Sequence, residues 1–135
     1  MQFSIIIPTF QNFKYLKNTL DSIDSNSSYK HEIIIHINGE DSETELYLKN
    51  KYIKFTKTKD NVGLCSGVNM AADISTKDYI LYSHDDMYFL PNWDNFLIDE
   101  INEIEHNKFY LSMTQISYTK GMKGNLQHIH YDCGD

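Results

Sequence analysis

Residues 5–7 and 33–35 are two runs of three consecutive isoleucines, and short β-branched runs of this kind are typical of buried strands. The first run predicts a strand over residues 3–7, which we expect Pro8 to end, and the second predicts a strand over residues 32–37. Between them, apolar residues recur at helical spacing and predict an amphipathic helix over residues 12–24 with Asn12 as its N-cap. The chain therefore begins as strand, helix, strand.

The same alternation continues toward the C-terminus. The further elements expected are a short polar helix around residues 46–48, an edge strand over 52–56, a helix from residue 64 in which Gly67 permits close packing against a sheet, a strand over 79–82, a helix with Trp93, Leu97, Ile101 and Ile104 on one face, and a last strand over 109–118. Strands separated by helices predict an α/β fold with a doubly wound, mostly parallel sheet. We expect one domain over residues 1–135.

Charge and hydropathy exclude several classes of protein. The chain has 12 Lys and no Arg against 19 Asp and Glu, and its formal net charge of -7 falls entirely in residues 61–135. A nucleic-acid-binding domain would normally present a basic face rich in arginine, so nucleic acid is not an expected partner. No apolar run near the N-terminus is long enough for a signal peptide or a membrane span, and Cys65 and Cys133 form no CxxC pair. These features predict a soluble, cytoplasmic protein.

Two adjacent carboxylates, Asp85 and Asp86, directly follow the strand expected at residues 79–82. Ligands of doubly wound sheets bind beyond the carboxyl ends of the strands, which is where this pair is expected to lie. Neighbouring carboxylates repel each other unless a cation offsets the charge, so the pair predicts a Mg²⁺ or Mn²⁺ site with His84 beside it. The alternative is a solvated loop in which one aspartate caps the next helix.

Other polar groups allow more than one interpretation. Residues 61–63, Asn-Val-Gly, predict a turn at a helix start where free N–H groups favour anions, although ordinary close packing explains the same pattern. His128 and His130 would face one side of a strand and could offer an imidazole to a metal, or they could be a half-exposed pair in a tail. Zinc-ligand spacing and a G-x-S-x-G elbow are both absent from the sequence, which disfavours zinc and serine-nucleophile chemistry.

Four segments occur in order, each at an expected strand end: SIIIPTFQN (4–12), EIIIHING (32–39), NVGLCSGVN (61–69) and YILYSHDD (79–86). Together they resemble the nucleotide-binding part of family 2 glycosyltransferases, which have the GT-A fold, and the resemblance covers residues 2–118. It implies a metal-dependent enzyme that transfers a sugar from a nucleoside-diphosphate donor, expected to be a UDP-sugar, to an acceptor hydroxyl of a carbohydrate or other molecule, with inversion. Residues 119–135 would be a tail or a shortened acceptor-side segment.

The resemblance also implies roles for individual residues. Those implied to bind the donor are Pro8, Thr9, Asn38, Asp41, Asn61, Gly63, Asn69 and Asp85. Asp86 is implied to bind Mn²⁺ or Mg²⁺, with His84 and His130 as candidate further ligands, and Asp132 or Asp135 is the candidate catalytic base. His84 and Asn38 stand where the family usually has aspartates, which affects metal affinity and base choice.

Two rival hypotheses remain. One is a nucleotide-sugar-binding core that lacks catalysis, because the family's base and acceptor site typically follow the metal motif, where this chain has only a short tail. The other is a nucleotidyltransferase, which joins a nucleoside triphosphate to a sugar phosphate. That class usually has a glycine-rich basic loop after its first strand, whereas residues 8–12 contain neither glycine nor a basic residue.

Overall fold

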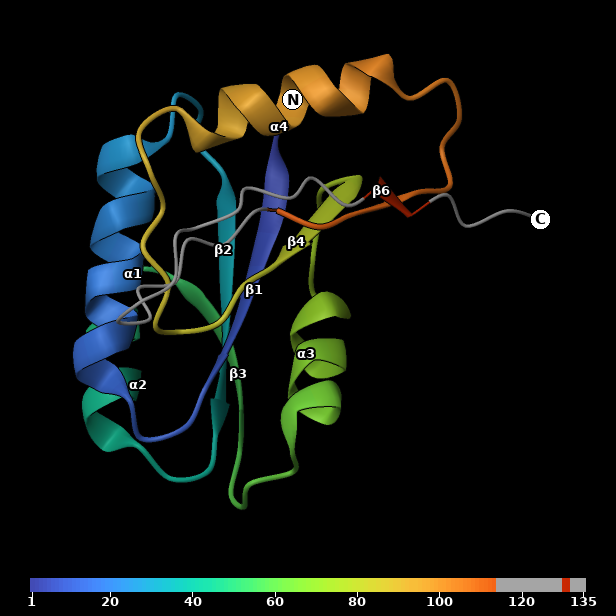
Figure 1. The fold of residues 1–135 in the computed structure, drawn as a ribbon. Helices are drawn as coiled ribbons and strands as arrows, with labels where there is room; N and C mark the ends of the chain where they lie inside the picture. The colour runs from blue at the N-terminus through green and yellow to red at the C-terminus, as the bar shows by residue number, and fades with distance from the viewer. Residues whose placement is uncertain (114–129, 132–135) are drawn as a thin grey trace, which may run out of the picture. The chain divides into compact units, whose positions relative to one another are not determined.

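The computed structural model describes residues 1–113 and the backbone of residues 130 and 131, and the chain divides into two compact units, Met1–Asp94 and Asn95–Asp135. The first unit contains a parallel sheet in the order β3-β2-β1-β4, formed by β1 (Phe3–Thr9), β2 (Glu32–Asn38), β3 (Lys54–Thr58) and β4 (Tyr79–Tyr82). The helices α1 (Phe13–Asn26) and α2 (Ser42–Asn50) cover one face of this sheet and α3 (Leu64–Ala72) covers the other (Figure 1). The α/β fold with a doubly wound parallel sheet is thus confirmed.

The two isoleucine runs pair with each other at the centre of the sheet. Ile5, Ile6 and Ile7 of β1 lie opposite residues 33–35 of β2, and every residue of β1 is buried. Ile6 and Ile34 form a buried cluster with Ala71 of α3. Helices on both faces explain why these strands are continuously apolar and do not alternate with polar residues.

Pro8 does not end the first strand as the sequence predicted, because β1 continues through Pro8 to Thr9. The carbonyl of Ile6 accepts a hydrogen bond from the Ser83 N–H at 3.0 Å, so Ile6 directs its backbone groups toward β4. Backbone groups alternate between the two neighbouring strands, so those of Pro8, two residues after Ile6, also face the β4 side. At that point β4 has already ended. The missing N–H of proline therefore costs no ladder hydrogen bond.

The third and last predicted strands also differ from the structure. Tyr52 lies in a turn with φ +55° and is 95% exposed, so β3 begins two residues later than expected, although its edge position is confirmed. Of the strand expected over 109–118, residues 109–113 are described and contain β5 (Tyr110–Leu111), while residues 114–118 lie outside the described residues. β5 pairs antiparallel with β6 (His130–Tyr131) in a separate sheet and does not join the parallel one.

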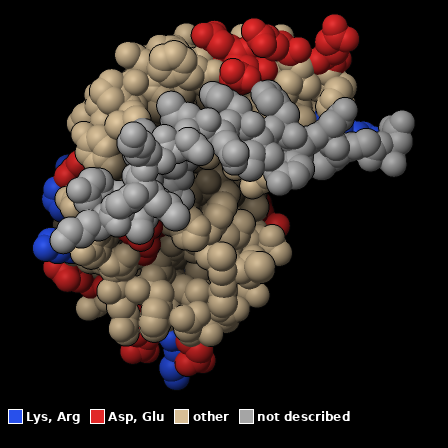
Figure 2. All heavy atoms as spheres, in the orientation of Figure 1, with Lys and Arg blue, Asp and Glu red and all other residues tan. Residues whose placement is uncertain are grey.

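The helix α4 (Trp93–Glu103) begins in the first unit and continues into the second. Acidic side chains gather in Figure 2 where Figure 1 places α4, and the sequence of this helix contains Asp94, Asp99, Glu100 and Glu103. This patch reflects the excess of acidic residues in the C-terminal half of the sequence. None of the helices in the described part of the chain is long and apolar enough to cross a membrane.

Candidate functional site

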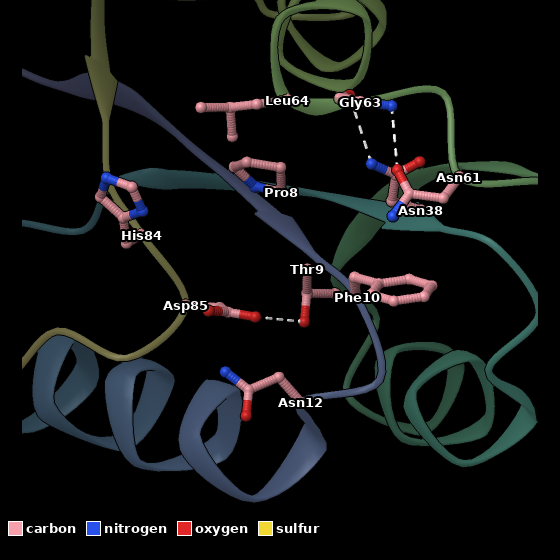
Figure 3. Close-up of a pocket in the computed structure, with 10 residues that line it drawn as sticks. All are labelled: Pro8, Thr9, Phe10, Asn12, Asn38, Asn61, Gly63, Leu64, His84 and Asp85. Carbon is pink, nitrogen blue, oxygen red and sulfur yellow. Dashed lines mark hydrogen bonds between the residues drawn. The ribbon is translucent and has the colours of Figure 1, made fainter.

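A cavity of about 390 Å³ opens where β1, β2 and β4 end. It is lined by Pro8, Thr9, Phe10, Asn12, Asn38, Asn61, Gly63, Leu64, His84 and Asp85. Figure 3 shows His84 and Asp85 on one side, Asn38, Asn61 and Gly63 on the other, and Pro8 and Thr9 between them. Seven of the residues predicted from the sequence to form a site are therefore brought together, from segments up to 77 positions apart (Pro8 to Asp85).

The Asp85 carboxylate is held at this cavity by a neighbouring strand. The hydroxyl of Thr9, at the buried end of β1, donates a hydrogen bond to Asp85 Oδ2 at 2.6 Å. Within the described residues, the second carboxylate oxygen takes no hydrogen bond from a side chain or from the backbone. Asp85 therefore presents one engaged and one available oxygen at the end of β4.

On the opposite side, Asn38 fixes the turn that leads into α3. Its Oδ1 accepts a hydrogen bond from the Val62 N–H at 2.7 Å and its Nδ2 donates to the Gly63 carbonyl at 3.2 Å. The Gly63 N–H donates to Asn61 Oδ1 at 2.9 Å, and Gly63 has φ +84°, a conformation that glycine adopts without strain. The Asn-Val-Gly turn predicted from the sequence is thus tied to the end of β2 by an amide that both donates and accepts.

The helix that follows this turn lies unusually close to the sheet. A Cβ atom added to Gly67 would lie 2.6 Å from Cδ2 of His36, so only glycine fits at this position, as the sequence predicted. His36 is fully buried in β2 and its Nδ1 pairs with the Thr56 hydroxyl of β3 at 2.8 Å. Burial lowers the pKa of His36, so its ring stays neutral and uncharged beneath α3.

Some predicted site residues lie away from the cavity. Asp41 caps α2, where its carboxylate accepts hydrogen bonds from the Thr44 N–H and hydroxyl at 3.0 and 2.7 Å, and it borders a second hollow. Asn69 is exposed on α3, and Asp86 is exposed beside Asp85; neither lines the cavity. Asp132 and Asp135 lie outside the described residues, as does the side chain of His130, so their roles stay predictions.

The cavity also includes residues that were not among the candidate site residues, although they lie in or beside the segments quoted for the resemblance. Phe10, Asn12 and Leu64 line the cavity, and Phe10 is 50% exposed. Asn12 occupies the N-cap position of α1, as expected, but its side chain makes no capping hydrogen bond. An asparagine at the N-cap position whose side chain does not cap the helix is a candidate binding residue, and only the structure shows that the side chain does not cap.

The charge of the lining bears on which ions the site could hold. None of its ten residues is Lys or Arg, and Asp85 adds a negative charge. In the described residues, no three His, Cys, Asp or Glu side chains are grouped so that they could hold a metal by themselves. Mg²⁺ and Mn²⁺, however, commonly take one or two carboxylates and complete their shell with substrate phosphates and water. Asp85 and the adjacent Asp86 fit that kind of shared site.

Comparisons with known structures agree on the fold. The crystal structure of TarS from S. aureus has a TM-score of 0.65 at 22% identity over 76% of this chain and 20% of that one. Residues 1–349 of TarS in complex with UDP match at 0.65 and 21% identity, over 76% of this chain and 32% of that one. The mannosyltransferase PcManGT from Pyrobaculum calidifontis, in complex with GDP-Man and Mn²⁺, matches at 0.60 and 15% identity, over 70% of this chain and 30% of that one.

This chain thus spans at most about a third of the length of these three structures. These neighbours share the GT-A arrangement of a parallel sheet between helices. No curated protein matches the chain in sequence. The model of one family, described as glycosyl transferase family 2, matches residues 4–130, which include all of the described elements from α1 to β5 and β1 except for its first residue. The chain belongs to glycosyl transferase family 2.

Proposed function

We propose that this chain binds a nucleoside-diphosphate sugar, preferably a UDP-sugar, in the cavity at the ends of β1, β2 and β4, and transfers the sugar to an acceptor hydroxyl with inversion. The observation that carries the proposal is the convergence of Thr9, Asp85 and the Asn38-anchored turn on one cavity in a family 2 chain. The solved neighbours include one in complex with UDP and one in complex with GDP-Man and Mn²⁺, which supports a donor of this class.

The chain's own residues would divide the work of binding. The half-exposed ring of Phe10 offers an apolar wall for a base, and the amides of Asn12 and Asn61 offer donors and acceptors for ribose or sugar hydroxyls. The start of α3, whose first N–H groups have no partner within the helix, faces the same cavity through Gly63 and Leu64 and favours a negatively charged ligand. Binding in this way would orient the anomeric carbon toward the acceptor.

A divalent cation completes the proposal because the lining contains neither Lys nor Arg. Asp86 and Asp85 would hold it, with His84 as a candidate further ligand. When bound, Mn²⁺ or Mg²⁺ neutralises the charge that develops on the departing nucleoside diphosphate. Transfer also requires a carboxylate that takes the proton of the acceptor hydroxyl, for which Asp132 and Asp135 remain the candidates.

The deciding experiment is calorimetric titration of UDP into the whole chain with Mn²⁺, repeated with excess EDTA and with GDP and ADP in place of UDP. We expect UDP to bind with Mn²⁺ and to lose binding when EDTA removes the metal. Binding that is unaffected by EDTA would remove the metal from the proposal. If no nucleotide binds under any of these conditions, the cavity is not a donor site.

Variants at the end of β4 locate the metal. We predict that Asp86→Ala abolishes metal-dependent UDP binding and leaves the fold intact, because Asp86 is exposed and has no structural role in the described residues. Asp78→Ala, which removes the same charge at the opposite end of β4, is the matched control and should bind UDP normally. Equal binding by both variants would exclude Asp86 from the site.

The alternative function is a nucleotide-sugar-binding core without transfer activity. It is favoured by His84 and Asn38, which stand where the family usually has aspartates. Donor hydrolysis, measured as release of UDP from a panel of UDP-sugars by this chain alone, separates the two hypotheses. Metal-dependent binding with no release from any donor, in the presence or absence of simple sugar acceptors, would favour the binding core.

A further inference from the structure

The helix α1 carries a row of small polar side chains that hold the loop after β4. Thr19, Ser22 and Asn26 recur at positions i, i+3 and i+7 and therefore share one face of α1. The Asn26 amide donates to the Phe89 carbonyl at 2.7 Å, and the Ser22 hydroxyl accepts from the Phe89 N–H at 3.0 Å. This end of the loop is thus bound to α1 through both backbone groups of Phe89.

Thr19 acts on the other end of the same loop, where the site residues lie. Its hydroxyl lies 2.9 Å from the carbonyl of Asp85 and 2.8 Å from the carbonyl of Met87, and one proton is shared between these two acceptors. A threonine in the middle of a helix often returns its hydroxyl to a carbonyl of the preceding turn. Here the hydroxyl is fully buried and bonds instead to a segment 66 residues away.

We propose that Thr19 is a positioning residue for the Asp85–Asp86 pair and that its buried hydroxyl sets the affinity for a metal-bound nucleoside diphosphate. The inference rests on the proposed function of the cavity. Asp85 is then fixed twice: Thr9 holds its carboxylate and Thr19 holds its main chain. With both contacts in place, the orientation of the Asp85 carboxylate is fixed, and its available oxygen points toward the cavity. The backbone of Asp86 is positioned by the same contacts because it directly follows Asp85.

The effect of Thr19 differs from a general contribution to stability, because Ser22 provides a comparison on the same helix face. Both hydroxyls are buried and both bind the loop, but Ser22 contacts Phe89, four residues beyond Asp85 and outside the cavity lining. Loss of the Thr19 hydroxyl leaves two part-buried carbonyls without their donor, and loss of the Ser22 hydroxyl leaves the buried Phe89 N–H without its acceptor. Both changes should therefore destabilise the fold to a similar degree. Only loss of the Thr19 hydroxyl should release the backbone of Asp85.

The test compares Thr19→Val, Thr19→Ser and Ser22→Ala in the whole chain, using UDP with Mn²⁺ as the probe. We expect Thr19→Val to raise the Kd about tenfold, as the loss of one buried hydrogen bond to a binding segment would. Thr19→Ser keeps the hydroxyl and should restore the Kd to within about twofold of the unmodified chain. Ser22→Ala should change the Kd by less than about threefold while lowering the urea midpoint as much as Thr19→Val does.

Equal weakening of UDP binding by Thr19→Val and Ser22→Ala would overturn the inference, because the effect would then follow stability alone. Hydrogen exchange of the amides at residues 85–87 provides a readout that needs no nucleotide. Thr19→Val should accelerate this exchange under native conditions, while Ser22→Ala should accelerate it mainly near Phe89. If the unmodified chain binds no nucleotide, the proposed function fails; unchanged exchange at residues 85–87 in Thr19→Val refutes the positioning role in either case.

Discussion

Asn38 shows how a single side chain can take the place of backbone hydrogen bonding at the edge of a site. Its amide accepts from the Val62 N–H and donates to the Gly63 carbonyl, so it joins the end of β2 to the turn before α3. Asn38 is 6% exposed, so most of the surface of this residue is covered by the protein. An aspartate could accept from Val62 but could not donate to Gly63.

We predict that Asn38→Asp weakens both the fold and donor binding. The change loses the hydrogen bond to the Gly63 carbonyl and places a negative charge against that oxygen, which should lower the free energy of unfolding by about 1–3 kcal/mol. It also adds a second carboxylate to a lining that has neither Lys nor Arg, so UDP binding with Mn²⁺ should weaken. Urea unfolding and calorimetry measure the two effects.

Asn107→Asp is the matched control for this change, because Asn107 is exposed and lies outside the cavity. It should leave both the urea midpoint and UDP binding close to those of the unmodified chain. If Asn38→Asp behaves like this control, the amide of Asn38 does not hold the turn.

At the scale of elements, α3 is positioned by the contact between Gly67 and His36. The ring of His36 fills the space where any other side chain at position 67 would begin. The same helix carries the cavity-lining turn at its N-terminus and packs Ala71 against Ile6 and Ile34. The close approach of α3 to β2 is therefore coupled to the shape of the cavity.

Replacement of Gly67 by alanine should destabilise the protein even though alanine favours helix by about 1 kcal/mol. The added Cβ would meet His36 Cδ2 at 2.6 Å, and relief of this clash requires α3 or the buried ring to move. We expect a loss of about 1–3 kcal/mol in urea unfolding, typical of an overpacked core. Ser66→Ala, at the adjacent exposed position, should be neutral or slightly stabilising. A Gly67→Ala chain as stable as Ser66→Ala would show that α3 is not held by this contact.

The elements themselves were largely predictable, because apolar periodicity and β-branched runs are local signals. β4 has the predicted bounds, and the predicted helices are all present. The errors arise where a distant segment decides the outcome: Pro8 remains in a strand because β4 ends before it, and among the described strands β5 pairs with the distant β6 and not with the parallel sheet. The contacts of Thr19 could not be predicted from the sequence for the same reason, because its partners are 66 and 68 residues away.

At the scale of the whole molecule, buried titratable groups join distant segments. His31 accepts from the Phe3 N–H through Nδ1 and faces Asp94 through Nε2, so the ring is neutral with its proton on Nε2. Burial lowers the pKa of His31 despite the neighbouring Asp94. Burial would raise the pKa of Asp94, but hydrogen bonds from Ser28, Tyr29 and His31 outweigh it and lower the pKa.

Glu32, at the start of β2, also makes the stability of the fold depend on pH. Burial would raise the pKa of Glu32, but hydrogen bonds from Lys54, Ser4 and Thr76 outweigh it and lower the pKa from 4.5 to about 2. A carboxylate whose pKa is lowered by folding stabilises the fold at pH values above its pKa in the unfolded chain. This stabilisation is lost as the pH falls toward its pKa in the folded chain. Glu32 therefore begins to lose its contribution below about pH 4.5.

We predict that stability already falls at a higher pH, because both buried histidines have a pKa below the ordinary value of 6.5. Below that pH the unfolded chain takes up protons at His31 and His36, whereas the folded chain does not, so acid favours unfolding. Each histidine should contribute a slope of up to about 1.4 kcal/mol per pH unit in this range.

Urea midpoints measured between about pH 7.5 and about pH 5.5 test this slope. His36→Gln should remove one proton from the linkage, while His106→Gln, at an exposed position, should retain the full slope. Equal midpoints at both ends of this range would mean that His31 and His36 accept protons as readily in the folded chain as in the unfolded one.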